Sequence, residues 1–350
     1  MKRTTRLAAL FFGLVIASII AIMPAMQSGA AAAAETAATP IASPMTSPVA
    51  GATGIEGAVK WLIFQQAKDG SFLGFTGEAD AGTTVDAIMA LAAAKHAGVD
   101  VGSSIENAVA YLASGDVALV YTQTGVGQSA KLALGLIAAG QSADDFAHVS
   151  PLLILEHGLN ADTRLYGTGL YDTALTMLAF AADGKGVPAT VLDALKATQA
   201  ENGGWAFDGS TEAANVDSNT TSMVVQALVA SGHADSELVT GGARYLKSTI
   251  ADGGARYNLA PDTAPDANST ALVAQGLLAT GENATPLLHA LAAFQNADGS
   301  FFYNAATPGA NLMATIQAIP ALAEAVFPIV PGAIDATPVA LFPAVLPLAA

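Results

Sequence analysis

The segment that decides the fold is Leu62-x-x-x-Gln66-x-x-x-Gly70-x-Phe72, where x is any residue. Two further copies follow, Leu195…Gln199…Gly203…Trp205 and Leu291…Gln295…Gly299…Phe301. Gln66 and Gln199 are 133 positions apart and Gln199 and Gln295 are 96 apart, which corresponds to three and two units of about 44–48 residues. Periods of this length are typical of helical repeat arrays. Each unit is therefore expected to contain a helix that ends near the Gln, a break at the Gly and a restart at the aromatic residue.

A second recurrent feature is a glycine at the expected end of the second helix of each unit. These glycines are Gly98, Gly140, Gly184, Gly232 and Gly281. Glycine commonly ends a helix because it adopts the left-handed conformation at little cost. The residue five positions before each glycine is always small, namely Ala93, Gly135, Ala179, Ala227 and Gly276. Small residues at one level let neighbouring helices approach closely, so these second helices are expected to pack against one another.

The spacing predicts six helical hairpins, with no strand alternation between Glu56 and Val326. The outer helices are expected near 56–66, 105–113, 148–157, 189–199, 238–248 and 285–295. The inner helices are expected near 83–97, 127–139, 170–182, 218–231, 267–279 and 311–325. Because the inner helices are almost entirely apolar, they should be buried on both sides, which favours a closed ring over an open solenoid. The expected fold is all-α: an α/α toroid (α6/α6 barrel) of six helical-hairpin repeats, spanning residues 55–326.

The N-terminal segment, residues 1–34, has the order of a secretory signal peptide. Met1–Arg6 is basic, Leu7–Ile22 is an unbroken apolar run, and small residues with Ala-x-Ala sites follow. An uncleaved membrane anchor is the alternative. Residues 35–54, rich in Ala, Thr, Pro and Ser, read as a linker. The expected location of the mature protein is therefore outside the cell or at its surface.

The C-terminal segment, residues 327–350, is apolar and rich in proline. Because proline removes backbone donors and breaks helices, this segment is not expected to form a spanning helix. It is interpreted as a tail, either a spacer or the stub of a longer architecture.

Charge and cysteine content exclude several classes of partner and site. The net charge is -16, and loss of Lys2, Arg3 and Arg6 with the signal peptide makes it -19. Such acidity argues against a nucleic-acid partner, whose phosphates require Lys and Arg. The chain has no cysteine, so thiolate nucleophiles and Cys-ligated zinc are excluded. Its five histidines lack the spacing of a helical metal site. Neither a metal nor a cofactor is expected.

The repeated motif resembles the repeat of the terpenoid cyclase and protein prenyltransferase superfamily, known as the QW motif in squalene–hopene cyclases. Asp217–Leu228 and Asp266–Leu277 look like the inner helices of exported bacterial members. Two other stretches, Tyr171–Leu175 and Gly127–Gly135, are more similar to the α-barrel of transcobalamin-type cobalamin carriers. The resemblance covers about residues 56–325 and implies the toroid fold.

The catalytic motifs that this resemblance implies are absent from the sequence. The chain has no Asp-x-Asp-Asp acid motif, no Asp-Asp-x-x-Asp motif for magnesium diphosphate, and no cysteine for a prenyltransferase zinc site. We therefore expect a non-catalytic protein that binds a small-molecule or polymer ligand. The alternatives are a terpenoid-cyclase-like or carbohydrate-active enzyme, and a structural cell-surface module.

Candidate site residues are the few polar side chains of the inner helices. Asp86 and Asp172 occupy equivalent first-turn positions, where they either act as an acid–base pair in a hydrolase or stabilise the helix dipole. The expected ligand-binding residues are Gln128, Lys131, Asp172, Gln226, Gln275 and Gln317. Three of these glutamines share one level of their helices, which favours either a polar cavity lining or bridges between helices.

Overall fold

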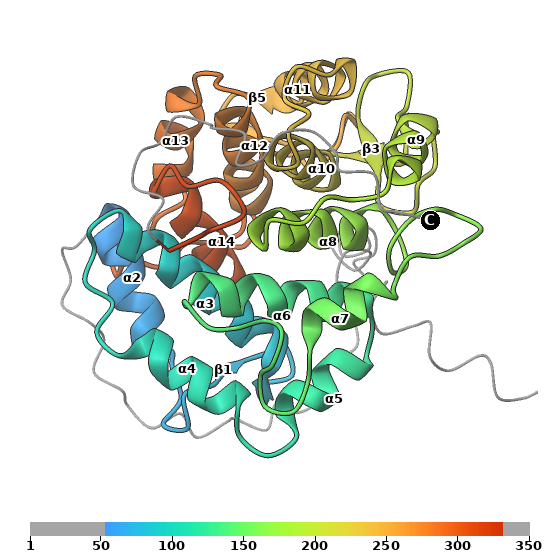
Figure 1. The fold of residues 1–350 in the computed structure, drawn as a ribbon. Coiled ribbons are helices and arrows are strands. Elements are labelled where there is room, and N and C mark those ends of the chain that lie inside the picture. Colours follow the sequence, from blue (N-terminus) through green and yellow to red (C-terminus); the bar gives the residue numbers. More distant parts are fainter. Residues whose placement is uncertain (1–52, 332–350) are drawn as a thin grey trace, which may run out of the picture. The chain divides into compact units, whose positions relative to one another are not determined.

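The inner helices form a closed ring in the part of the chain that the computed structural model describes, residues 53–331. They are α3 (Ala81–His96), α6 (Val126–Ala138), α8 (Leu170–Ala182), α10 (Ser218–Ala230), α12 (Ala267–Ala279) and α14 (Leu312–Leu322). Each packs against the next in this order, and α14 packs against α3, so the ring is closed (Figure 1). The expected closed toroid is confirmed, and each inner helix lies within three residues of its predicted range.

The outer helices cover this ring. They are α2 (Gly54–Phe64), α4 (Ser104–Leu112), α7 (Pro151–Glu156), α9 (Ala189–Thr198), α11 (Glu237–Thr249) and α13 (Thr285–Ala292). The inner helices are buried on both sides as a result: in α10 and in α12, twelve of thirteen residues are buried. Amphipathic outer helices and uniformly apolar inner ones are what a two-layered ring requires.

Small residues bring neighbouring inner helices together, as the sequence predicts. A Cβ added to Gly135 of α6 would lie 2.6 Å from Cγ1 of Val85 on α3. A Cβ added to Gly276 of α12 would lie 2.7 Å from Oγ of Ser222 on α10. Both distances are shorter than real Cβ contacts, so these two helix pairs pack at a separation that only glycine permits.

The glutamine of the recurrent motif joins consecutive units. Gln66 Nε2 donates to the carbonyl oxygen of Gly70 within its own loop and to that of Ser104 at the start of α4, both at 2.9 Å. Gln199 Nε2 does the same with Gly203, at 2.8 Å, and with Leu238 of α11, at 3.0 Å. Each motif thus attaches its loop to the outer helix of the next unit.

The glycine of the motif is required by both conformation and space. Gly70, Gly203 and Gly299 have φ values of 92°, 93° and 93°, in the region that L-residues rarely adopt. A Cβ at Gly203 would lie 2.4 Å from the carbonyl oxygen of Gly241 in α11. The aromatic residue that follows, Phe72, Trp205 or Phe301, is fully buried. The motif therefore sets the close approach of one unit to the next.

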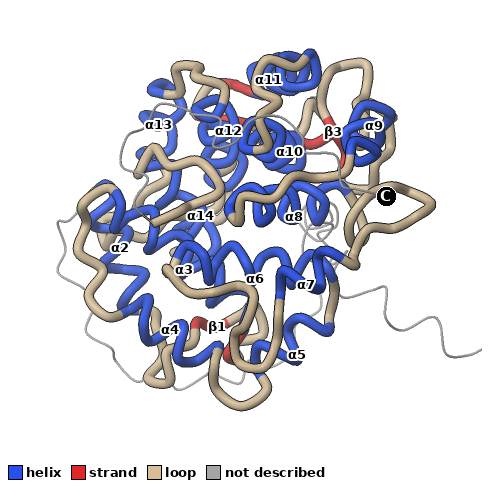
Figure 2. The backbone as a smooth tube through the Cα atoms, in the orientation of Figure 1, coloured by secondary structure: helices blue, strands red, loops and turns tan. Residues whose placement is uncertain are grey.

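Three short strand pairs within residues 53–331 correct the expectation of no strands between Glu56 and Val326. The strands are drawn in red in Figure 2. The pairs are β1 (Phe72–Leu73) with β2 (Ala79–Asp80), β3 (Trp205–Ala206) with β4 (Val216–Asp217), and β5 (Ile250–Ala251) with β6 (Gly254–Ala255). All are antiparallel and two residues long. A strand of two residues is too short to show the alternation by which strands are recognised in a sequence.

Other differences concern the short connections. An additional helix, α5 (Val117–Gln123), fills the stretch between α4 and α6. The helix expected near 148–157 is limited to α7, because the Ser150 hydroxyl caps its start and Pro151 occupies its first turn. The last inner helix, expected to reach residue 325, ends at Leu322 and contains Pro320.

The packed part of the chain extends slightly past the predicted bounds of 55–326. It begins at Gly54, and Ile329 after the last helix is still buried. The proposed signal peptide and nearly all of the proposed linker and tail, residues 1–52 and 332–350, lie outside the described residues. Within residues 53–331, no helix combines the length and apolarity needed to cross a membrane.

Candidate functional site

The N-terminal ends of the inner helices lie on one side of the ring. The Leu170 N–H at the start of α8 donates to the carbonyl oxygen of Phe207, which lies in the loop before α10. In the same way, the Ser218 N–H of α10 donates to the carbonyl oxygen of Tyr257 in the loop before α12, and the Ala267 N–H of α12 donates to that of Tyr303 in the loop before α14. Because each bond joins the start of one inner helix to the loop that leads into the next, these starts share one rim.

Carboxylate and amide caps start four of the inner helices at this rim. The side chains of Asp80, Asp217, Asp266 and Asn311 accept the backbone N–H three residues further on, at 2.6, 2.7, 2.8 and 2.9 Å. Such caps satisfy the free donors of a first helical turn.

Two of the caps are buried carboxylates. Asp217 and Asp266 are 1% and 3% exposed, and burial raises their pKa to about 7 and about 6. Among the described residues, Asp217 Oδ2 has no hydrogen-bond partner.

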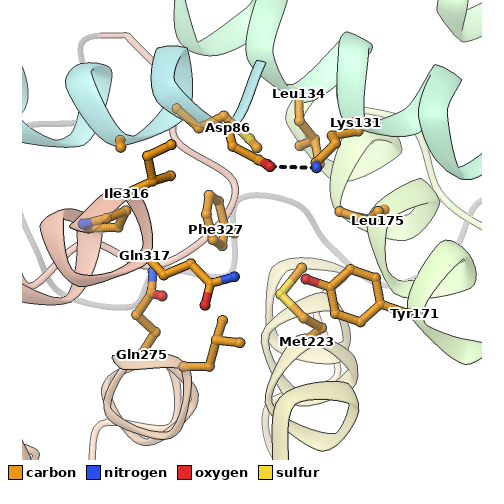
Figure 3. A pocket seen from close by; sticks show the side chains of 14 residues that line it. Asp86, Lys131, Leu134, Tyr171, Leu175, Met223, Gln275, Ile316, Gln317 and Phe327 are labelled. Atoms are coloured by element: carbon orange, nitrogen blue, oxygen red, sulfur yellow. Dashed lines mark hydrogen bonds and ion pairs between the residues drawn. The ribbon is translucent and has the colours of Figure 1, made fainter. Parts of the chain in front are cut away.

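The inner helices line a small, partly open cavity, called here the ring cavity, with a volume of about 50 Å³. Every inner helix contributes to its lining (Figure 3). The contributions include Asp86 from α3, Lys131 from α6, Tyr171 from α8, Met223 from α10, Gln275 from α12 and Gln317 from α14. The remaining walls are apolar, and Phe327, which follows α14, also lines the cavity.

An ion pair dominates the electrostatics of the ring cavity. Lys131 Nζ lies 2.6 Å from Asp86 Oδ2, and the two side chains are 25% and 14% exposed. Burial raises the pKa of Asp86, and the Lys131 charge opposes that rise. Burial is the largest single influence on the Lys131 pKa and lowers it, but the charge and hydrogen bond of Asp86, together with the nearby Tyr121 and Tyr171, outweigh burial and raise that pKa. Each charge therefore depends on the other in an otherwise apolar wall.

Tyr171 adds a hydroxyl to the same region. Burial raises its pKa to about 12, so its hydroxyl stays protonated at neutral pH and can donate a hydrogen bond. At the level of the glutamines, Gln317 Oε1 is buried and has no hydrogen-bond partner within residues 53–331. The ring cavity thus combines an internally neutralised ion pair, a hydroxyl donor and a free amide acceptor.

The two carboxylates considered as an acid–base pair are placed differently. Asp86 lines the ring cavity, whereas Asp172 does not. Asp172 Oδ2 accepts the N–H and the hydroxyl of Thr168, at 2.8 and 2.9 Å, in the loop before its own helix. Its carboxylate also packs closely against two glycines. A Cβ added to Gly127 would lie 2.1 Å from Asp172 Oδ1, and a Cβ added to Gly167 would lie 2.4 Å from Asp172 Oδ2. Asp172 therefore anchors a loop, and the structure does not bring the two carboxylates together in the cavity.

The other expected ligand-binding residues are divided between the ring cavity and its surroundings. Lys131, Gln275 and Gln317 line it. Gln128 folds back toward Gly125, where a Cβ would meet its Oε1 at 2.6 Å, and it does not line the cavity.

Gln226 Oε1 accepts the Phe327 N–H at 2.9 Å. Gln275 Nε2 donates to the Ala325 carbonyl oxygen at 3.0 Å. Two of the three equivalent glutamines therefore hold the chain that follows α14, a role that the sequence did not indicate.

Sequence reasoning also missed Tyr171, Met223 and Phe327 as lining residues. Tyr171 and Met223 carry no distinguishing signal, because apolar and aromatic residues are common throughout the inner helices. Phe327 lies in the apolar run Val326–Val330 directly after the last helix. That run was a usable signal, since an apolar stretch leaving a ring is expected to find a buried surface.

No group of three or more His, Cys, Asp or Glu side chains suited to a metal ion occurs within residues 53–331.

Comparison with solved structures identifies the fold. The type II terpene cyclase MstE from Scytonema aligns with a TM-score of 0.56 and 14% identity, over 77% of this chain and 96% of that one. The GH76A alpha-1,6-mannanase from Salegentibacter sp. HEL1_6 aligns with a TM-score of 0.57 and 10% identity, over 77% and 97%. No protein-family model and no curated protein matches the sequence. Because identities this low carry the fold alone, the conclusion is that this chain has the terpenoid cyclase-like α/α toroid fold.

Proposed function

We propose that this protein is an exported, non-catalytic ring that binds the apolar end of a small ligand in its ring cavity. The observation that carries this proposal is the contact between Asp86 and Lys131, at 2.6 Å. It neutralises the carboxylate that faces the cavity and leaves the cavity without net charge from this pair.

Acid–base catalysis requires a carboxylate that can exchange a proton with the reacting group. Asp86 is held by an ammonium group, and Asp172 is held by Thr168 outside the cavity. Neither is placed to act as one of two carboxylates flanking a substrate, as glycoside hydrolysis requires. Binding without chemistry is the function that this arrangement supports best.

The lining defines the chemical class of ligand. Apolar side chains such as Met89, Leu134 and Leu175 favour a hydrocarbon group. The free Gln317 Oε1 favours a hydrogen-bond donor on the ligand, because an unpaired buried acceptor is costly. A charged ligand is disfavoured, since Lys131 and Asp86 already neutralise each other. A slender, uncharged molecule with a hydroxyl or amide N–H satisfies all three conditions.

The volume limits how much of such a ligand can enter. Pockets for drug-sized molecules usually measure about 300–1,000 Å³, whereas the ring cavity measures about 50 Å³. Only a narrow end of a ligand, such as a short alkyl chain, fits within it.

Straight-chain primary alcohols from ethanol to decanol provide the test, measured by titration calorimetry on the folded protein. Each methylene that enters the cavity contributes about 0.8 kcal/mol, or roughly a fourfold lower Kd. We expect the affinity to rise with chain length and then level off where the chain reaches Phe327.

A matched pair of variants assigns the binding to the ring cavity. Gln317→Leu removes the acceptor for the alcohol hydroxyl, so it should weaken the binding of every alcohol by a similar factor. Gln128→Leu, on a glutamine outside the cavity, should leave the series unchanged. The proposal would be overturned if the affinity did not depend on chain length, or if Gln317→Leu left the affinities unchanged.

A structural surface module is the second candidate, and the small volume of the ring cavity favours it. The alcohol series separates the two, because a purely structural ring gives no chain-length dependence.

Export is part of the proposal and rests on the sequence of residues 1–34. N-terminal sequencing of the protein recovered outside its host cells tests it. We expect a new N-terminus within or just after the Ala-rich stretch that ends at Ala34. Retention of Met1 on cell-bound protein would instead support the membrane anchor.

A further inference from the structure

The chain that follows α14 turns into the ring instead of leaving it. Glu324 has a φ of 50°, a left-handed conformation that redirects the backbone after the helix. Residues Ala325–Pro331, called here the plug segment, then pass the ring cavity. Phe327 lines that cavity (Figure 3), and Ile329 is only 5% exposed.

The plug segment is attached to the ring by few hydrogen bonds. Gln275 Nε2 donates to the Ala325 carbonyl oxygen at 3.0 Å, and the Phe327 N–H donates to Gln226 Oε1 at 2.9 Å. Within residues 53–331, the plug segment makes one further hydrogen bond, from the Ala325 N–H to the Pro320 carbonyl oxygen in α14, at 2.9 Å. Pro328 and Pro331 have no N–H to donate.

The last described residue extends this path to a second cavity. Pro331 lies beside Gly140 at the end of α6, 3.9 Å from where a Cβ would stand. It also lines a groove of about 320 Å³ between α3, α4 and α6. The plug segment thus crosses from the end of α14 to the end of α6, and side chains rather than a backbone ladder hold it there.

We propose that the plug segment is a displaceable stopper, which leaves the ring as a unit while the helices stay folded and so sets the depth of the ring cavity. Its biological meaning rests on the proposed ligand-binding function, whereas its detachment can be measured without any ligand. Segments with few buried contacts and few backbone hydrogen bonds open locally at lower free energy than the whole protein unfolds. The two glutamines act as its latches.

Displacement couples to binding by population shift. A ligand too long for the closed cavity binds only the open state, so its apparent affinity is reduced by the fraction of molecules that are open. A ligand short enough for the closed cavity binds both states alike and shifts nothing. The plug segment therefore discriminates ligands by length.

Thiol labelling measures the detachment directly, because the chain has no cysteine of its own. Ile329→Cys places a single thiol on a buried position of the plug segment. Val273→Cys, a fully buried position in α12, is the matched control. With a maleimide reagent in native buffer, we expect Cys at 329 to react at least 100-fold faster than Cys at 273. Equal rates would show that the segment is released only by global unfolding, and would overturn the proposal.

The latches are tested in the Ile329→Cys background. Gln226→Leu and Gln275→Leu each remove one hydrogen bond to the plug segment, so each should accelerate labelling roughly 5- to 10-fold. Gln317→Leu, a glutamine at the same level with no bond to the plug segment, is the control and should leave the rate unchanged. If all three variants label alike, the glutamines are not latches and the proposal fails.

The alcohol series tests the effect on depth. Phe327→Ala shortens the stopper, so the chain length at which affinity levels off should increase by several methylenes relative to the parent protein. An unchanged plateau would show that Phe327 does not limit the cavity, against the proposal. If no alcohol binds any variant, the proposed function fails, but the labelling rates still decide whether the plug segment opens.

Discussion

Gln295 Nε2, in the last unit, donates to the carbonyl oxygen of Gly54 at the start of the first unit, 241 positions earlier, at 2.9 Å. The Gly54 N–H returns a bond to Gln295 Oε1 at 2.6 Å. Gln66 and Gln199 make the corresponding contact to the unit that follows them in sequence. The same side chain in the same motif therefore links consecutive units twice and closes the ring once.

Substitution of this closing glutamine should destabilise the protein measurably. Gln295→Leu removes both bonds to Gly54 and a third to the Gly299 carbonyl oxygen. We expect the free energy of unfolding to fall by about 1–3 kcal/mol, because half-buried polar groups lose their partners. Urea unfolding followed by circular dichroism measures it. Gln65→Leu, which removes a single contact to Trp61 at 3.4 Å, is the control. A loss no larger than that of the control would contradict the closing role.

The motif glycines should tolerate no side chain. Gly203→Ala forces an L-residue to φ 93° and places its Cβ 2.4 Å from the Gly241 carbonyl oxygen. We expect it to lower the free energy of unfolding by at least about 3 kcal/mol, since strain and overpacking add. Gly98→Ala, at φ 83° with no atom within 4 Å of the new Cβ, isolates the conformational part. It should lose only about 1–2 kcal/mol, and equal losses in the two variants would rule out a steric role for the close approach.

The ion pair in the ring cavity should be costly to break and nearly neutral to replace. Lys131→Met leaves the Asp86 carboxylate buried without its partner and should lower stability by about 3–5 kcal/mol. The double variant Asp86→Leu/Lys131→Met should recover to within about 1 kcal/mol of the parent protein. Thermal and urea unfolding at pH 7 measure both.

A surface pair provides the reference for that experiment. Lys247 Nζ lies 2.7 Å from Glu282 Oε1, with the two side chains 49% and 41% exposed. Lys247→Ala should therefore change stability by less than about 1 kcal/mol. A similar effect at Lys131 and at Lys247 would show that the ring cavity does not isolate its pair from water.

Asp217 should make the protein less stable as pH rises. Burial raises its folded-state pKa to about 7, above the ordinary value of 3.8. The folded state therefore holds a proton that the unfolded state has released between these values. Stability from this group is complete below about pH 4, is lost progressively up to about pH 7, and then stays low. The full effect amounts to roughly 4 kcal/mol.

Asp217→Asn tests this, because asparagine still caps α10 through its carbonyl oxygen. We expect the variant to be more stable than the parent at pH 8, and the difference to shrink or reverse at pH 5. Asp252→Asn, on an exposed residue, is the control. Parallel pH profiles for the parent and Asp217→Asn would show that this carboxyl does not titrate in the window.

The parts of the fold that recur could be predicted from the sequence. Gly98, Gly140 and their equivalents fix where the inner helices end, and apolar runs between them require burial on both sides. The β3–β4 pair and α5 could not be predicted, because two-residue strands and a seven-residue helix have too few positions to show a period. Their conformation is set by neighbouring units, not by local preference.

The site was predictable only in part, for a similar reason. Lys131 stands out as a cation in an apolar helix, and it does face the ring cavity. Gln226 is indistinguishable by position from Gln317, yet it binds the plug segment while Gln317 leaves an acceptor free. What separates them is the path of the chain after Leu322, and no pattern in the helices themselves encodes that path.

The closing bond between Gln295 and Gly54 also means that the ring has no first or last repeat. In an open array, the terminal repeats need polar outer faces of their own, whereas here each unit is covered on both sides. The contacts between units therefore do not depend on which unit carries the N-terminus and which carries the C-terminus. A circular permutant, with the two ends of the ring joined by a linker and new termini in the exposed loop 211–214, should assemble the same set of interfaces. This closure should slow folding, because an interface between residues 241 positions apart forms only after nearly the whole ring has been brought together.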